Sequence, residues 1–258
     1  MEGPSGVVAL VLAETAAGGT AFLWATGLWG AVKRGYFILT TSVALGCALL
    51  ATLAASGAAS PARVEGVRLA VALSVATSVL LGLSLSLLIL RVGEPSRVLG
   101  ALGAVAGVAM LAGFARVSGP APGAALLQLL AGAAFMGAVT NGLLLGHWYL
   151  VDRRLPRDHI HRYAVLLIGA VAVEAAAVGL LGFGGSAAAG FSPLLRIAGL
   201  ATWLAMGMVA CTALIAVLIR ATLKGTGPRA VQAATGFFYL AVITAFTAEM
   251  AAKVGFLG

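Results

Sequence analysis

Residues 36–60 read YFILTTSVALGCALLATLAASGAAS, a run without a single acidic or basic side chain. An α-helix rises about 1.5 Å per residue, so about 20 apolar residues cross the roughly 30 Å hydrocarbon core of a bilayer. The run lacks the alternation of apolar and polar residues that a membrane-spanning strand would show. This stretch therefore predicts a transmembrane helix.

The rest of the chain repeats this pattern. Of its 258 residues, 61% are hydrophobic and only 9% are charged, whereas a soluble domain has about 25% charged residues. We therefore expect an all-α fold, a polytopic integral membrane bundle in the lipid bilayer, forming a single transmembrane domain over residues 1–258. Its helices, about eight in number, are expected near residues 6–30, 36–60, 67–90, 99–115, 123–151, 163–183, 197–219 and 230–252.

Short turns and small residues are expected to organise the bundle. Gly-Glu-Pro-Ser at 93–96 is predicted to form a turn in which Ser96 caps the following helix. Gly-x-x-x-Gly spacings at 103–107 and 142–146 favour close helix packing, because glycine lets two backbones approach each other.

Basic residues are distributed unequally between the two sides. One side has eleven: Lys33, Arg34, Arg91, Arg97, Arg153, Arg154, Arg157, Arg162, Arg220, Lys224 and Arg229. The other has five: Arg63, Arg68, Arg116, Arg196 and Lys253. The positive-inside rule predicts that the first side is cytoplasmic and that both termini lie on the non-cytoplasmic side.

The net charge of +8 then follows from cytoplasmic loops that face anionic lipid, and it requires no nucleic-acid partner. Lysine accounts for only three of the 16 basic residues, and Ala and Gly are abundant. This composition is typical of a GC-rich bacterial genome, so we expect a multi-pass protein of the bacterial plasma (inner) membrane.

Acidic residues inside the predicted spans are the first functional candidates, since charged groups at membrane depth are costly. They are Glu14, Glu174 and Glu249, all expected in the outer half of the membrane. Glu249 precedes Lys253 by four residues, the favourable order for a helical ion pair, which we expect at the membrane interface. Glu14 and Glu174 have no basic neighbour on their own helices, so each must be protonated, paired across helices or facing water.

The last predicted helix has polar residues at alternating spacings of three and four. Gln232, Thr235, Tyr239, Glu249 and Lys253 belong to this series, together with Val242 and Phe246. The spacing predicts one polar stripe that faces the protein interior. Such a stripe either bonds neighbouring helices or lines a conduit.

A second candidate site lies at the cytoplasmic end of the fifth predicted helix, where His147, Trp148 and Tyr149 follow Asn141. Aromatic residues are expected at this depth as an interfacial belt. A histidine beside them could exchange a proton and bind the head group of a quinone.

Other cofactors have less support. A bis-histidine haem needs two intramembrane histidines, and only His147 qualifies. His159 and His161 are expected in the next loop, which predicts a solvated turn and no metal site. The chain also has no phosphate-binding glycine loop, no His-Glu-x-x-His and no Cys-x-x-Cys.

Three functions remain open. The chain could be a membrane subunit of an electron-transfer or energy-coupling complex that meets quinone or relays protons, assembled with other membrane or peripheral subunits. It could be a stand-alone transporter or channel for protons, a cation or a small solute. It could also be a structural or assembly subunit without chemistry of its own.

Overall fold

The computed structural model describes residues 3–30, 32–57, 64–117, 121–152, 154–182, 197 and 199–256. Within these ranges the chain forms eight α-helices, each long and apolar enough to cross a membrane, and no strand. The helices are α1 (Gly3–Gly27), α2 (Arg34–Gly57), α3 (Val64–Ile89), α4 (Gly93–Ala115), α5 (Pro122–Val151), α6 (Asp158–Leu181), α7 (Leu200–Thr222) and α8 (Pro228–Phe256). The predicted all-α, multi-pass membrane bundle is confirmed.

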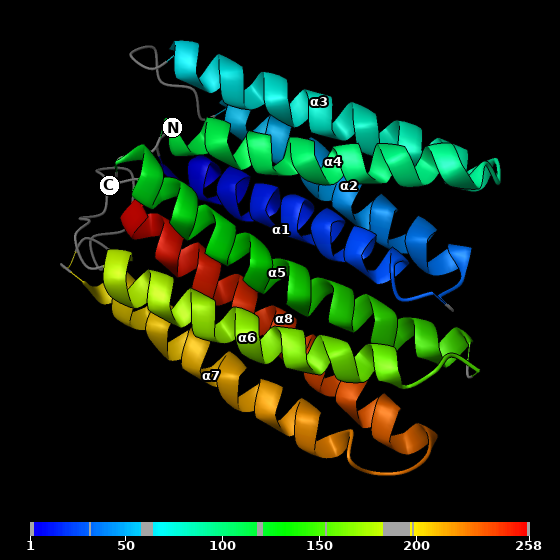
Figure 1. The fold of residues 1–258 in the computed structure, drawn as a ribbon. Helices are drawn as coiled ribbons and strands as arrows, with labels where there is room; N and C mark the ends of the chain where they lie inside the picture. The colour runs from blue at the N-terminus through cyan, green and yellow to red at the C-terminus, as the bar shows by residue number, and fades with distance from the viewer. Residues whose placement is uncertain are drawn as a thin grey trace.

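The eight helices form two groups of four (Figure 1). In the first group α1 packs on α2, α2 on α3, α3 on α4, and α4 back on α1. Helices α5 to α8 form a second closed ring in the same order. The rings are joined chiefly by α1 against α5, with α8 also touching α1.

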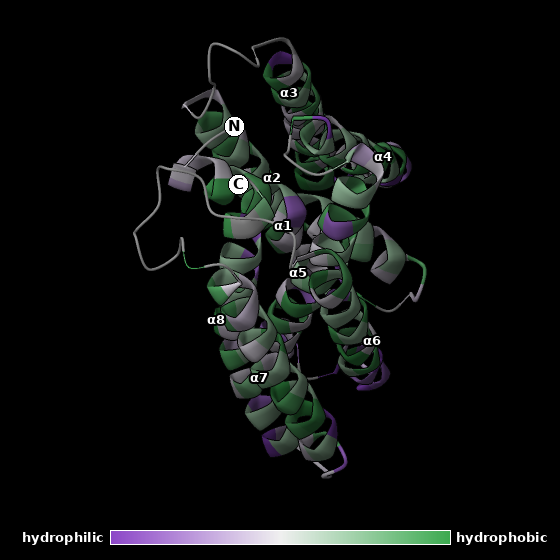
Figure 2. Ribbon diagram, turned by 90° about the vertical axis from the view of Figure 1, so that its left-hand side faces the viewer, coloured by the Kyte–Doolittle hydropathy of each residue, from purple (hydrophilic) through white to green (hydrophobic). Residues whose placement is uncertain are grey.

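Both termini lie at the same end of the bundle, as an even number of spans requires (Figure 1). The connections after α1, α3, α5 and α7 lie at the opposite end, which we predict to face the cytoplasm. Hydrophobic residues cover the length of the helices, and hydrophilic ones gather near helix ends such as those of α6 and α7 (Figure 2). Lipid-exposed walls and polar ends are the pattern of a membrane-spanning bundle.

Close packing around α1 depends on small residues. A Cβ atom added to Gly18 would lie 1.7 Å from the carbonyl oxygen of Ala133 in α5, and one added to Gly107 of α4 would lie 3.0 Å from the Cα atom of Ala17. On the other side of α5, added Cβ atoms at Gly142 and Gly146 would meet Phe238 and Thr235 of α8. Of the predicted glycines, Gly107 therefore lets two helix backbones approach each other, whereas Gly142 and Gly146 leave room for side chains of α8.

Three helix ends differ from the prediction by four residues or more. Helix α4 begins at Gly93, so Pro95 sits in its first turn, where proline is tolerated. Ser96 does not cap this helix, because its hydroxyl donates to the carbonyl of Ser84 in α3 at 3.4 Å. Helix α6 begins at Asp158, and α8 continues to Phe256.

Candidate functional site

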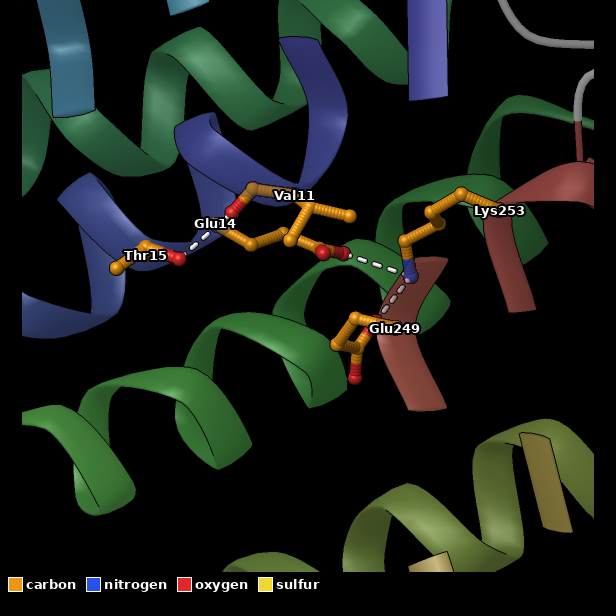
Figure 3. Close-up of polar contacts among 5 residues, drawn as sticks. All are labelled: Val11, Glu14, Thr15, Glu249 and Lys253. Atoms are coloured by element: carbon orange, nitrogen blue, oxygen red, sulfur yellow. Dashed lines mark hydrogen bonds and ion pairs between the residues drawn. The ribbon is translucent and has the colours of Figure 1, made fainter. Parts of the chain in front are cut away.

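The central polar group of the bundle joins its first and last helices. The Nζ atom of Lys253 lies 2.8 Å from Oε1 of Glu14 and 2.9 Å from Oε2 of Glu249. Figure 3 shows the ammonium between the two carboxylates, with Glu14 reaching from α1 and the other two side chains from α8. All three side chains are 0% exposed, so the pairing lies inside the protein and not at the membrane interface as predicted for Glu249 and Lys253.

Glu174 of α6 completes the group. Its side chain is 1% exposed, and the charged groups near enough to act on it are those of Glu249 and Lys253. Among the described residues, neither oxygen of Glu174 has a hydrogen-bond donor. We call Glu14, Glu174, Glu249 and Lys253 the carboxylate cluster. It confirms that the three acids point into the bundle and that Glu14 is paired across helices.

Helix α5 makes room for the cluster at Gly132. A Cβ atom added there would lie 2.5 Å from Oε1 of Glu14 and 2.9 Å from Oε2 of Glu249. Any larger residue would therefore push the carboxylates away from Lys253.

The neighbouring Thr15 does not supply a donor to the cluster. Its hydroxyl donates to the carbonyl of Val11, one turn back in α1, at 2.7 Å (Figure 3). The threonine hydroxyl is thus satisfied on its own helix. Among the described residues, Lys253 is the only cation in an ion pair with Glu14 or Glu249.

The residues of the polar stripe predicted on the last helix do not share one inward face, so that prediction is wrong. Thr235, Glu249 and Lys253 are buried, but Gln232 is exposed and the side chain of Tyr239 is 49% exposed. Alternating spacings of three and four form two columns of residues, and only one column faces the interior. Lys253 belongs to the outer column but faces inward. Positions seven residues apart are rotated by about 20° around the helix axis, and over the length of α8 this rotation brings Lys253 to the inner side.

The predicted site near His147 is not gathered into one place. His147 is exposed, Trp148 lies over the backbone of Gly35 in α2, and the hydroxyl of buried Tyr149 donates to the carbonyl of Pro156. Consecutive helical residues point about 100° apart, so these three side chains diverge. His147 therefore does not share a face with Trp148 and Tyr149, and the three side chains do not form one site.

Asn141 belongs to a separate buried contact. Its Nδ2 atom donates to the carbonyls of Gly19 at 3.1 Å and Gly137 at 3.0 Å, and its Oδ1 atom accepts from the hydroxyl of Tyr36 at 3.2 Å. Two of these bonds tie α5 to α1 and α2 and the third stays within α5, so the amide has a structural role.

The two remaining histidines lie in the first turn of α6 and not in a loop. His159 is buried and stacks on Trp29, with ring centroids 5.8 Å apart. His161 turns to α7, where its Nδ1 atom lies 3.3 Å from a guanidinium nitrogen of Arg220. In the described part of the chain, no three His, Cys, Asp or Glu side chains are arranged to hold a metal ion.

One member of the site is not recognisable in the sequence, and another is predicted at the wrong depth. Gly132 resembles the many packing glycines of this chain, and only its contact with two carboxylates distinguishes it. The predicted last helix ends at residue 252, which places Lys253 among the basic residues of the non-cytoplasmic side, whereas α8 continues to Phe256. The ion-pair spacing with Glu249 and the polar stripe of the last helix are the two sequence signals that place it inside.

Comparison with known proteins adds no assignment. No protein-family model matches the chain, and no curated protein or solved structure does so. Function is therefore argued from the carboxylate cluster itself.

Proposed function

We propose that this protein transfers protons within the bacterial plasma membrane, as an integral membrane subunit of an energy-coupling complex. The observation that carries the proposal is one buried ammonium, that of Lys253, paired with the buried carboxylates of Glu14 and Glu249 beside a third buried carboxyl group, that of Glu174.

The charge of the cluster is unbalanced. Three ionised carboxylates and one ammonium have a net charge of −2, in a region where unpaired charge is penalised by several kcal/mol. A proton shared between Glu174 and Glu249 would relieve this excess, because two adjacent carboxyl groups form a hydrogen bond only when one of them is protonated. The cluster is therefore suited to hold a proton that can leave and return.

A proton fits this group better than a metal cation does. The ammonium of Lys253 already occupies the position between Glu14 and Glu249, at 2.8 and 2.9 Å. An incoming cation would compete with it at close range, whereas a proton needs only a free oxygen on Glu174.

The cluster lies in the predicted outer half of the membrane, below the ends of the helices. Glu249 is seven residues before the end of α8 at Phe256, a distance of about 10 Å along the helix. The described helices leave little chain outside the membrane for catalysis, which favours work with partner subunits. This proposal places no quinone at His147, because the structure separates that residue from Trp148 and Tyr149.

Proton flux into liposomes tests the function. The purified chain is reconstituted with a trapped pH-sensitive dye, and a potassium diffusion potential drives protons inward. We expect flux above that of empty liposomes, reduced to the empty level by Glu174→Gln. The matched control is Glu94→Gln, which removes an exposed carboxylate at the other end of the bundle and should leave the flux unchanged.

The outcomes separate the three functions. Flux that Glu174→Gln leaves intact would contradict a role of the cluster. Flux of sodium or potassium ions in place of protons would favour the stand-alone cation transporter. The protein is a structural subunit if the wild type alone gives no flux above that of empty liposomes and no cluster variant alters the flux of the native assembly.

A further inference from the structure

A concave site lies at the predicted cytoplasmic end of the first ring, away from the carboxylate cluster. It is a pocket of about 620 Å³ between α1, α2, α3 and α4. Its size falls within the roughly 300–1,000 Å³ of small-molecule sites. No member of the carboxylate cluster lines it.

The pocket combines an apolar wall with a basic rim. Leu23, Phe37, Leu81 and Leu88 contribute to the wall, and the guanidinium groups of Arg34, Arg91 and Arg97 are the charged groups of the lining. Among the residues that the structure describes, no acidic side chain lines the pocket, although Glu94 lies 3.2 Å from the guanidinium of Arg97 and offsets one charge. The complementary ligand is therefore an anion attached to an apolar chain.

Arg91 is held in a conformation that its side chain does not favour. Its φ of 66° lies in the left-handed region, and it is the one non-glycine residue with positive φ in the described structure. The amide of Arg91 donates to the carbonyl of Leu88, and that of Val92 donates to Leu87. This is the Schellman pattern that ends a helix, and its left-handed position is usually glycine.

An arginine at a glycine position points to a use for its guanidinium, since such strain persists where it serves function. Arg34 supports the same rim in another way. Its guanidinium donates to the carbonyl of Leu88 at 3.1 Å, which fixes one charged group beside the end of α3.

We propose that this pocket binds an anionic phospholipid of the cytoplasmic leaflet. The phosphate lies against the guanidinium groups of Arg91, Arg97 and Arg34, and an acyl chain follows the wall formed by Leu23, Leu81 and Phe37. Basic pockets between helices on the cytoplasmic side are suited to such head groups. The proposal does not depend on proton transfer by the carboxylate cluster.

Native mass spectrometry of the full chain in mild detergent tests the site. The protein is titrated with phosphatidylglycerol, with phosphatidylcholine of the same acyl chains, and with glycerol phosphate. We expect phosphatidylglycerol to bind best, and Arg91→Gly to weaken it roughly fivefold. Arg97→Gln should weaken it to a similar extent, and Arg229→Gln is the control, since it removes a basic charge at the same end of the bundle without lining the pocket.

The variant Arg91→Gly separates binding from folding, because glycine suits the left-handed position. Its thermal midpoint should be unchanged or higher while lipid binding falls. Equal binding of phosphatidylglycerol by wild type and Arg91→Gly would overturn the proposal. Equal binding of the zwitterionic lipid would also overturn it, and tight binding of glycerol phosphate would show that the site recognises a free phosphate and not a lipid.

Discussion

Removal of the Lys253 ammonium is expected to destabilise the bundle more than any other single change in the carboxylate cluster. In Lys253→Met the side chain stays apolar and of similar length, but Glu14 and Glu249 lose their partner at 2.8 and 2.9 Å. The net charge of the ionised cluster goes from −2 to −3. Breaking a buried ion pair by removing one partner costs about 3–5 kcal/mol, and we expect a loss of stability in that range.

A double-mutant cycle sharpens this prediction. Glu14→Gln leaves the pair of Lys253 and Glu249 and lowers the excess charge to −1, so it should cost less, about 1–3 kcal/mol. The double variant returns the ionised cluster to −2. It should therefore be more stable than the sum of the single changes implies, by at least about 1 kcal/mol.

The assay is unfolding by increasing sodium dodecyl sulfate in mixed micelles, followed by helical circular dichroism and tryptophan fluorescence. Wild type, both single variants and the double variant are compared at one pH and one lipid ratio. If Lys253→Met were as stable as wild type, or if the two changes were simply additive, the ion pairs would not stabilise the bundle as we reason.

Two further changes test other contacts. Gly132→Ala should lower stability by about 1–3 kcal/mol in the same unfolding assay, because its Cβ atom would lie 2.5 Å from Oε1 of Glu14. The control is Gly169→Ala, whose Cβ atom would meet no atom within 4 Å and which should be neutral. Equal effects of the two changes would refute the packing argument. The ion pair with Lys33, at 2.7 Å, holds the pKa of Asp152 below its ordinary value, so the stability that this contact adds is present above the ordinary carboxyl pKa and is lost as pH falls through the lowered one. A carboxyl-detected NMR titration should find the Asp152 midpoint returning to the ordinary value in Lys33→Met, and an unchanged midpoint would exclude the contact in solution.

The spans could be predicted because the cost of charge in lipid acts locally along the chain. Long uncharged runs such as 36–60 become helices whatever their neighbours are, and the predicted and observed ranges overlap for all eight helices. Helix ends were less predictable where charged residues continue a helix past the apolar run. Asp158 begins α6 and Lys253 lies within α8 for this reason.

The site was only partly predictable, because it depends on contacts between distant parts of the chain. That Glu14 and Glu174 face inward follows from the cost of exposing an acid to lipid. Glu14 meets Lys253 because α1 contacts α8. No local sequence pattern predicts that contact. The site predicted at His147 is wrong for a local reason. Residues that are adjacent in a helix point in different directions, so His147, Trp148 and Tyr149 cannot share one face.

Whether the carboxylate cluster holds an exchangeable proton is decided most directly by infrared difference spectroscopy of the reconstituted protein. Hydrogen–deuterium exchange near neutral pH should reveal the carbonyl stretch of a protonated carboxyl group, and Glu174→Gln should abolish or shift that band. Glu94→Gln should leave it unchanged. A wild-type spectrum without a protonated carboxyl band, or a band that persists unaltered in Glu174→Gln, would contradict a shared proton in the cluster.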